Sequence, residues 1–196
     1  MKASYKNCEP KKTNGFTDLP VAGVYVAEIQ AVRFVAGEDG QRDRIECFME
    51  ITEGEYANRF HEVYDDQKER FGDDAKYKGI FRLVCPSEDD EDWRKRTFEG
   101  NLWCVQQSNP GYTWDWDEKK LKGKKVGINL RNRLYTYNGK NRSTVEIARF
   151  ETVDDVRNGK CKPAKDRDQR ENKDDVEEST SGSEFTDVSK DVAVPW

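Results

Sequence analysis

The sequence predicts a mainly β domain followed by a long acidic tail, and three features lead to that prediction. Up to about residue 160, β-branched and aromatic residues gather in short runs separated by turn residues, as in proteins built from several short strands. One segment in the middle instead repeats its apolar residues at helical spacing. Beyond Cys161 almost no large apolar residue occurs until Phe185, and a segment with so little to bury is expected to stay disordered.

The first half of the chain is expected to contribute three strands. Residues 24–35 and 44–51 flank a turn cluster with two glycines at residues 37–40, and two such runs around a Gly-containing loop are typical of a β-hairpin. A second turn at residues 54–55 precedes a third predicted strand over residues 59–64.

A helix is expected after this third strand. Residues 79–85 are compatible with either a short strand or a helix, and Pro86 ends them. Ser87 can cap a helix that begins among the acids at 88–92, where negative charge favours the helix dipole. Apolar residues then recur at helical spacing, namely Trp93, Phe98, Leu102 and Val105.

A second hairpin completes the predicted domain. Residues 124–134 and 143–150 are expected to pair around a turn at residues 137–140, which contains Asn-Gly. A short helix is expected at residues 153–157.

The resulting order, β-β-β-α-β-β, predicts an OB-like fold, a partly open five-stranded barrel with a helix between strands 3 and 4. A β-sandwich with an inserted helix gives similar local signals and is the alternative. We therefore expect a flexible arm over residues 1–18, an OB-like domain over residues 19–160, and a disordered acidic tail over residues 161–196.

Charge is divided unevenly between the predicted domain and the tail. The chain has a net charge of −5, and residues 165–196 alone carry five basic and ten acidic residues. The remainder is therefore neutral, so the overall acidity does not argue against a nucleic-acid-binding domain.

The cysteines and the hydropathy pattern predict a reduced, cytoplasmic protein. The five cysteines, at positions 8, 47, 85, 104 and 161, are odd in number and lack short spacing, so they support neither a disulfide framework nor a zinc site. No apolar run approaches 18 residues, and the N-terminus lacks the apolar region of a signal peptide.

Basic and aromatic residues interleave on the predicted strands, which is what a single-strand binder needs to follow phosphates and to stack bases. Arg131, Arg133 and Tyr135 share one strand face because strand side chains alternate. An ordinary exposed strand face gives the same pattern. The candidate phosphate contacts are Arg33, Arg44, Arg59, Arg131, Arg133 and Lys140, and the candidate stacking platforms are Phe34, Phe60, Tyr135 and Tyr137.

The acidic tail ends in a short apolar segment, and such an anchor suits a partner pocket rimmed by Lys or Arg. It resembles the C-terminal tip of bacterial single-stranded DNA-binding proteins, where acids precede an Ile-Pro-Phe end that recruits replication and repair enzymes. The resemblance implies partner binding by Asp191, Val194, Pro195 and Trp196, with Asp187 among the acids. Lys190 departs from the pattern, and Trp196 packing back onto the domain is the alternative.

Residues 19–25, LPVAGVY, are similar to the opening of a group of small phage proteins long known only as a domain of unknown function. Residues 54–59, 121–127 and 137–140 resemble a strand connector and the last hairpin of that group, whereas the insert at 66–92 departs from it. Proteins of the group are encoded in replication and recombination modules, and some are regarded as single-stranded DNA-binding proteins. The resemblance implies a phage replication or recombination protein in the host cytoplasm. Whether it is a homo-oligomer stays open.

Two other function classes stay open. Acidic loops and tail could mimic nucleic acid in a protein-interaction module, such as an inhibitor of a host enzyme. Paired acids at 65–66, 73–74 and 89–92 could bind the metal of a nuclease. However, no nucleotide-binding glycine motif occurs, and His61, the only histidine, has no nucleophile motif near it. We therefore expect a non-enzymatic protein without a cofactor.

Overall fold

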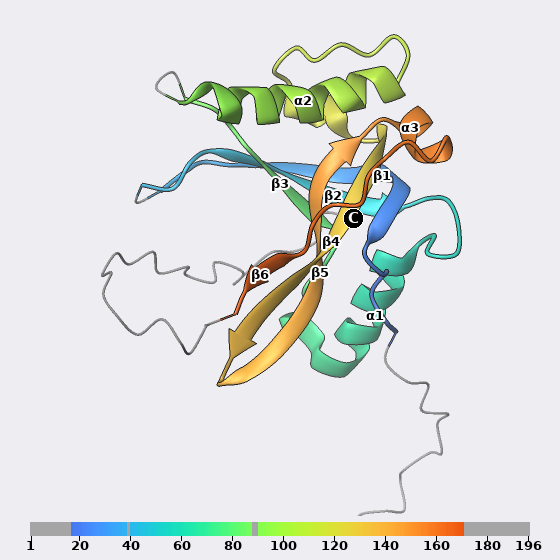
Figure 1. Cartoon of the computed structure of the whole chain (residues 1–196), viewed down its shortest axis with the longest axis vertical. Coiled ribbons are helices and arrows are strands. Elements are labelled where there is room, and N and C mark those ends of the chain that lie inside the picture. The colour runs from blue at the N-terminus through green and yellow to red at the C-terminus, as the bar shows by residue number, and fades with distance from the viewer. Residues whose placement is uncertain (1–16, 39, 88–89, 171–196) are drawn as a thin grey trace, which may run out of the picture.

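The computed structural model describes residues 17–38, 40–87 and 90–170. Its centre is a sheet in which five strands follow the order β3-β2-β1-β4-β5 (Figure 1). Every neighbouring pair on this path is antiparallel, and a short sixth strand pairs with β4 in parallel. The strands are β1 (Gly23–Val35), β2 (Arg44–Ile51), β3 (Ile80–Val84), β4 (Lys125–Tyr137), β5 (Lys140–Glu151) and β6 (Arg167–Gln169). The prediction of a mainly β domain is confirmed.

Both predicted hairpins are present. The β1–β2 pair contains a register shift between Ile29 and Ala31, and such a bulge bends a strand. This allows β1 to pair with β4 through its first half and with β2 through its second. At the β4–β5 turn, Asn138 and Gly139 have φ angles of 50° and 68°, as a two-residue hairpin turn with positive φ at both positions requires.

The predicted strand over residues 59–64 is wrong, because α1 (Arg59–Phe71) occupies this segment. Its N-terminus is capped from a distance: the buried carboxylate of Glu50 in β2 accepts hydrogen bonds from the backbone N–H groups of Phe60 (3.2 Å) and His61 (2.8 Å). The local N-cap residue, Asn58, makes no side-chain hydrogen bond to the helix, so the start of α1 depends on a residue of the preceding strand. The third strand is β3, in the segment that the sequence left open between strand and helix.

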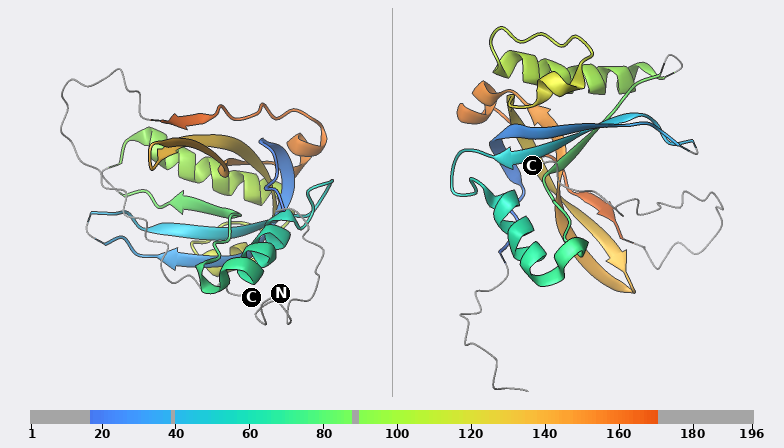
Figure 2. Two further views of the ribbon diagram at one scale, coloured as in Figure 1. Left: turned by 90° about the horizontal axis from the view of Figure 1, so that it is seen from below. Right: turned by 180° about the vertical axis from the view of Figure 1, so that it is seen from behind.

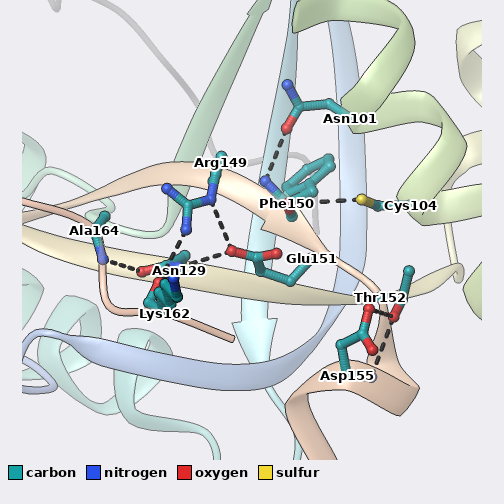
Figure 3. A network of polar contacts seen from close by, with 10 residues as sticks. All are labelled: Asn101, Cys104, Asn129, Arg149, Phe150, Glu151, Thr152, Asp155, Lys162 and Ala164. Carbon is teal, nitrogen blue, oxygen red and sulfur yellow. Dashed lines mark hydrogen bonds and ion pairs between the residues drawn. The ribbon is translucent and has the colours of Figure 1, made fainter. Parts of the chain in front are cut away.

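Helix α2 (Asp92–Ser108) lies where it was predicted, and Phe98, Leu102 and Val105 face the core. β3 and β5, the two end strands of the sheet, contact each other along a seam, and α2 packs against both of them there. At this seam Asn101 Oδ1 accepts a hydrogen bond from the backbone N–H of Phe150 at 2.8 Å (Figure 3), and the rings of Phe81 and Phe150 lie 4.4 Å apart. Helices α1 and α2 are on opposite sides of β1 and β2 (Figure 1).

The chain after α3 (Val153–Arg157) returns to the sheet. The buried side chain of Asn129 in β4 donates to the Lys162 carbonyl (2.9 Å) and accepts from the Ala164 N–H (2.9 Å) (Figure 3). These contacts precede β6, so part of the segment assigned to the tail is attached to the domain.

Residues 1–16 of the predicted arm and 171–196 of the predicted tail lie outside the described residues. The described cysteines, Cys47, Cys85, Cys104 and Cys161, are all free. None of the helices in the described ranges has the length and apolar character needed to cross a membrane.

Candidate nucleic-acid interface

Three arginines from three adjacent strands meet around one buried carboxylate. Arg33 in β1, Glu46 in β2 and Arg82 in β3 are register partners, so they lie side by side on one face of the sheet. Glu46 accepts hydrogen bonds from Arg33, from Arg44 Nε at 3.1 Å and from Arg82 Nε at 3.2 Å. Further along the same face of β2, Glu50 caps the N-terminus of α1. We call Arg33, Arg44 and Arg82 with Glu46 the arginine cluster.

The arginine cluster presents excess positive charge to solvent. The Glu46 side chain is only 3% exposed, whereas that of Arg82 is 55% exposed. Burial raises the pKa of Glu46, but hydrogen bonds from Arg33 and Arg44 outweigh that effect and hold this pKa below its ordinary value. Glu46 is therefore ionised at neutral pH, and three guanidinium groups around one carboxylate leave a net charge of +2.

Replacing Glu46 with glutamine is expected to cause a loss of stability that depends on pH. Because the folded-state pKa lies below the ordinary 4.5, the ionised carboxylate stabilises the fold above pH 4.5, and this stabilisation is lost as the pH falls through the folded value. The urea midpoints of wild type and Glu46→Gln should therefore differ most near pH 7 and converge in acid. The matched control is Glu62→Gln, which alters an exposed carboxylate. A difference for Glu46→Gln that grows toward acid would contradict the expectation.

A second buried carboxylate gathers two more arginines nearby. The Asp90 side chain is 1% exposed and pairs with Arg42, in the loop before β2, and with Arg94 in α2, whose Nη1 lies 3.2 Å away. Asp90 Oδ2 also accepts a hydrogen bond from the backbone N–H of Ser87, with a distance of 2.7 Å between nitrogen and oxygen. The hydrogen bond from Arg42, followed by that from Ser87, holds the pKa of Asp90 well below its usual range. We call Arg42 and Arg94 with Asp90 the Asp90 group.

The β4–β5 hairpin carries the second set of predicted residues. Arg131 Nε lies 2.8 Å from Glu146 in β5, and Arg133 Nε donates to Gln169 in β6 at 2.7 Å. The guanidinium of Arg133 lies 5.7 Å from the centre of the Tyr135 ring. Tyr137 and Lys140 are exposed near the turn. Figures 1 and 2 show that the β1–β2 and β4–β5 hairpins project toward the same side of the molecule.

Three predicted residues do not join these groups as expected. Phe60 lies on the side of α1 that faces the hydrophobic core and is 2% exposed, so its ring is not accessible for stacking. Arg59 is on α1, next to Glu62 and over the Tyr56 ring. Phe34 pairs with Ile45, so it lies on the face opposite Arg33, although it is exposed. The predicted partner-binding residues Asp191, Val194, Pro195 and Trp196 lie outside the described residues.

Arg82, Arg42 and Arg94 were not among the predicted interface residues. Trp93 was predicted on the apolar face of α2 with Phe98, Leu102 and Val105, but it is exposed. A usable signal was present for Arg82, because it alternates with the apolar residues of a short strand. No local pattern indicates Arg94, because Asp90 brings it together with Arg42 only in the folded protein.

The described members of the acidic pairs do not gather into a metal site, and Asp89 lies outside the described residues. Within residues 17–38, 40–87 and 90–170, no three His, Cys, Asp or Glu side chains come together as metal ligands would. Asp66 is instead paired with Arg70 at 3.0 Å, and Asp90 with its two arginines. A scan against protein-family models finds no match for this chain, and a search among curated proteins finds none either.

Proposed function

We propose that this protein binds single-stranded DNA without sequence preference and without catalysis. The observation that carries the proposal is the arginine cluster, in which one buried carboxylate organises three partly exposed guanidinium groups. Like charges held this close repel one another, and an anion on the open side relieves the repulsion. Guanidinium groups match phosphate oxygens in geometry and charge.

The strand arrangement supports an OB-like barrel as the class of fold. The order β3-β2-β1-β4-β5, with α2 between β3 and β4 along the chain, is the order expected of that fold. The rings of Phe81 in β3 and Phe150 in β5 lie 4.4 Å apart, which supports closure between the two end strands. OB-folds bind oligonucleotides on the face of strands 2 and 3 and with the loops between strands 1 and 2 and strands 4 and 5. The arginine cluster lies on that face, Arg42 lies in the first loop, and Tyr137 and Lys140 flank the second.

Within this class, we propose a phage single-stranded DNA-binding protein that acts in replication or recombination in the host cytoplasm. The sequence similarities at 19–25, 54–59, 121–127 and 137–140 support this narrower proposal. The apolar segment at 194–196, with the acids before it, is proposed to recruit replication or recombination proteins.

The proposal predicts selective and salt-dependent binding of oligo(dT). In fluorescence anisotropy, the full chain should bind labelled oligo(dT) more tightly than duplex DNA of the same length. Each phosphate contacted on single-stranded DNA contributes about −0.7 to the slope of log K against log salt. Three contacts from the arginine cluster therefore give a slope of about −2 or steeper.

Other outcomes point to other functions. Affinity that does not change with ionic strength would exclude an interface made of phosphate contacts. Absence of binding to both ligands would favour a protein-interaction module. Shortening of the oligonucleotide that requires Mg²⁺ would reveal a nuclease.

A further inference from the structure

We propose that the single-stranded DNA path does not end at the arginine cluster but continues over β3 onto α2, where exposed tryptophans stack its bases. This inference rests on the proposed function and adds a second binding region to it. The region consists of Trp93, Trp103 and Trp116, which we call the tryptophan surface. Their side chains belong to α2 and to the loop that follows it.

The two regions are connected by adjoining pockets. One pocket, of about 260 Å³, is lined by Arg82 of the arginine cluster, by Arg42 and Arg94 of the Asp90 group and by Trp93. The other, of about 310 Å³, is lined by Trp103 and Trp116. Pro86 and Phe98 line both pockets. A ligand that leaves the arginine cluster therefore meets the Asp90 group and then the tryptophan surface.

The tryptophan surface is exposed to an extent that a purely structural role does not require. Trp93, Trp103 and Trp116 are 54%, 52% and 73% exposed, although a Trp side chain is among those that stabilise a fold most when they are buried. Trp116 also has a φ of 68°, a left-handed conformation that is strained for a bulky side chain. In this conformation its ring stacks near Phe98, with ring centres 6.1 Å apart and planes at 19°.

Charge along the connecting path suits an unpaired polynucleotide. The arginine cluster and the Asp90 group together contain five arginines and two carboxylates, and both carboxylates are buried beneath the guanidinium groups. These two groups therefore carry a net charge of +3, and Glu99 lines the pocket beside Trp103 and Trp116. The guanidinium of Arg94 lies 4.9 Å from the centre of the Trp93 ring, so a cation and an aromatic face occur together. Sequence-independent single-strand binders combine these two elements, cations for phosphates and aromatic rings for bases.

The test separates base stacking from phosphate contact. The double variant Trp103→Ala/Trp116→Gly removes two rings, and glycine at 116 adopts a positive φ without steric cost. The ligands are labelled oligo(dT) of about 16 nucleotides, near the upper site size of one OB-fold, and an abasic oligonucleotide of the same length. Phe71→Ala, which removes an exposed ring on α1, is the matched control.

The double variant should lose about tenfold in oligo(dT) affinity for each ring removed, while its affinity for the abasic strand stays unchanged. Phe71→Ala should bind both ligands as the wild type does. An equal loss for both ligands, or no loss for either, would overturn the inference, and the second result would leave the tryptophan surface for a protein partner. The proposed function would survive either result, because in this experiment only a wild type that binds neither ligand would contradict it.

Discussion

Exchanging Arg44 and Arg82 together for glutamine should lower the affinity for oligo(dT) about 100-fold at low salt. Each side chain is expected to contact a phosphate, and a hydrogen bond to a charged group contributes about 1.5–3 kcal/mol. The slope of log K against log salt should become shallower by about 1.4, because two phosphate contacts are lost. Glutamine still offers Glu46 a hydrogen-bond donor, so the variant is expected to fold. Anisotropy titrations over a range of salt concentrations measure both quantities.

The control for this variant removes the same charge elsewhere. Arg70 in α1 and Arg157 in α3 form ion pairs with Asp66 and Glu53, and neither belongs to the arginine cluster. The Arg70→Gln/Arg157→Gln variant should keep nearly the wild-type affinity and slope. If both double variants lost the same affinity, net charge alone would explain the binding and the arginine cluster would have no special role.

Replacing Glu50 with alanine should destabilise the protein by about 3–5 kcal/mol, because it leaves several buried hydrogen-bond donors without a partner, each at a cost of about 1–3 kcal/mol. In addition to capping α1, Glu50 accepts hydrogen bonds from the Tyr77 hydroxyl (3.2 Å) and from the Ile51 backbone N–H (2.9 Å). Its contact with His61 Nδ1 is 2.9 Å. Urea unfolding followed by circular dichroism measures the loss.

Glu62→Ala is the control for the stability measurement. Glu62 lies in the first turn of the same helix, and its exposed carboxylate pairs with Arg59. Exposed substitutions of this kind usually change stability by less than about 0.5 kcal/mol. If Glu50→Ala were no more destabilising than Glu62→Ala, the distant cap would not be what holds α1 in place.

The two hairpins and α2 were predictable because their signals are local. The Asn138-Gly139 turn requires positive φ at two adjacent positions, which this residue pair adopts readily. In α2, Phe98, Leu102 and Val105 fall on one face at helical spacing. In both cases residues that are neighbours in sequence are also neighbours in space, so the element can be predicted from the sequence alone.

The segment at 59–64 was mispredicted for the opposite reason. Its β-branched and aromatic residues favour a strand, whereas the cap that makes it a helix comes from Glu50, on the preceding strand. Phe60 was accordingly assigned to an exposed strand face but faces the core.

The sequence by itself determined the mainly β character, the two hairpins, the position of α2 and the location of the net negative charge in the last residues, because each depends on local composition or spacing. Only the tertiary structure decided that Arg33, Arg44 and Arg82 share one buried carboxylate, and that Trp93 is exposed rather than part of the core. Strand order and register set these relations, and they join residues far apart along the chain. A local sequence pattern carries no information about which distant side chain will share a carboxylate or cover a ring.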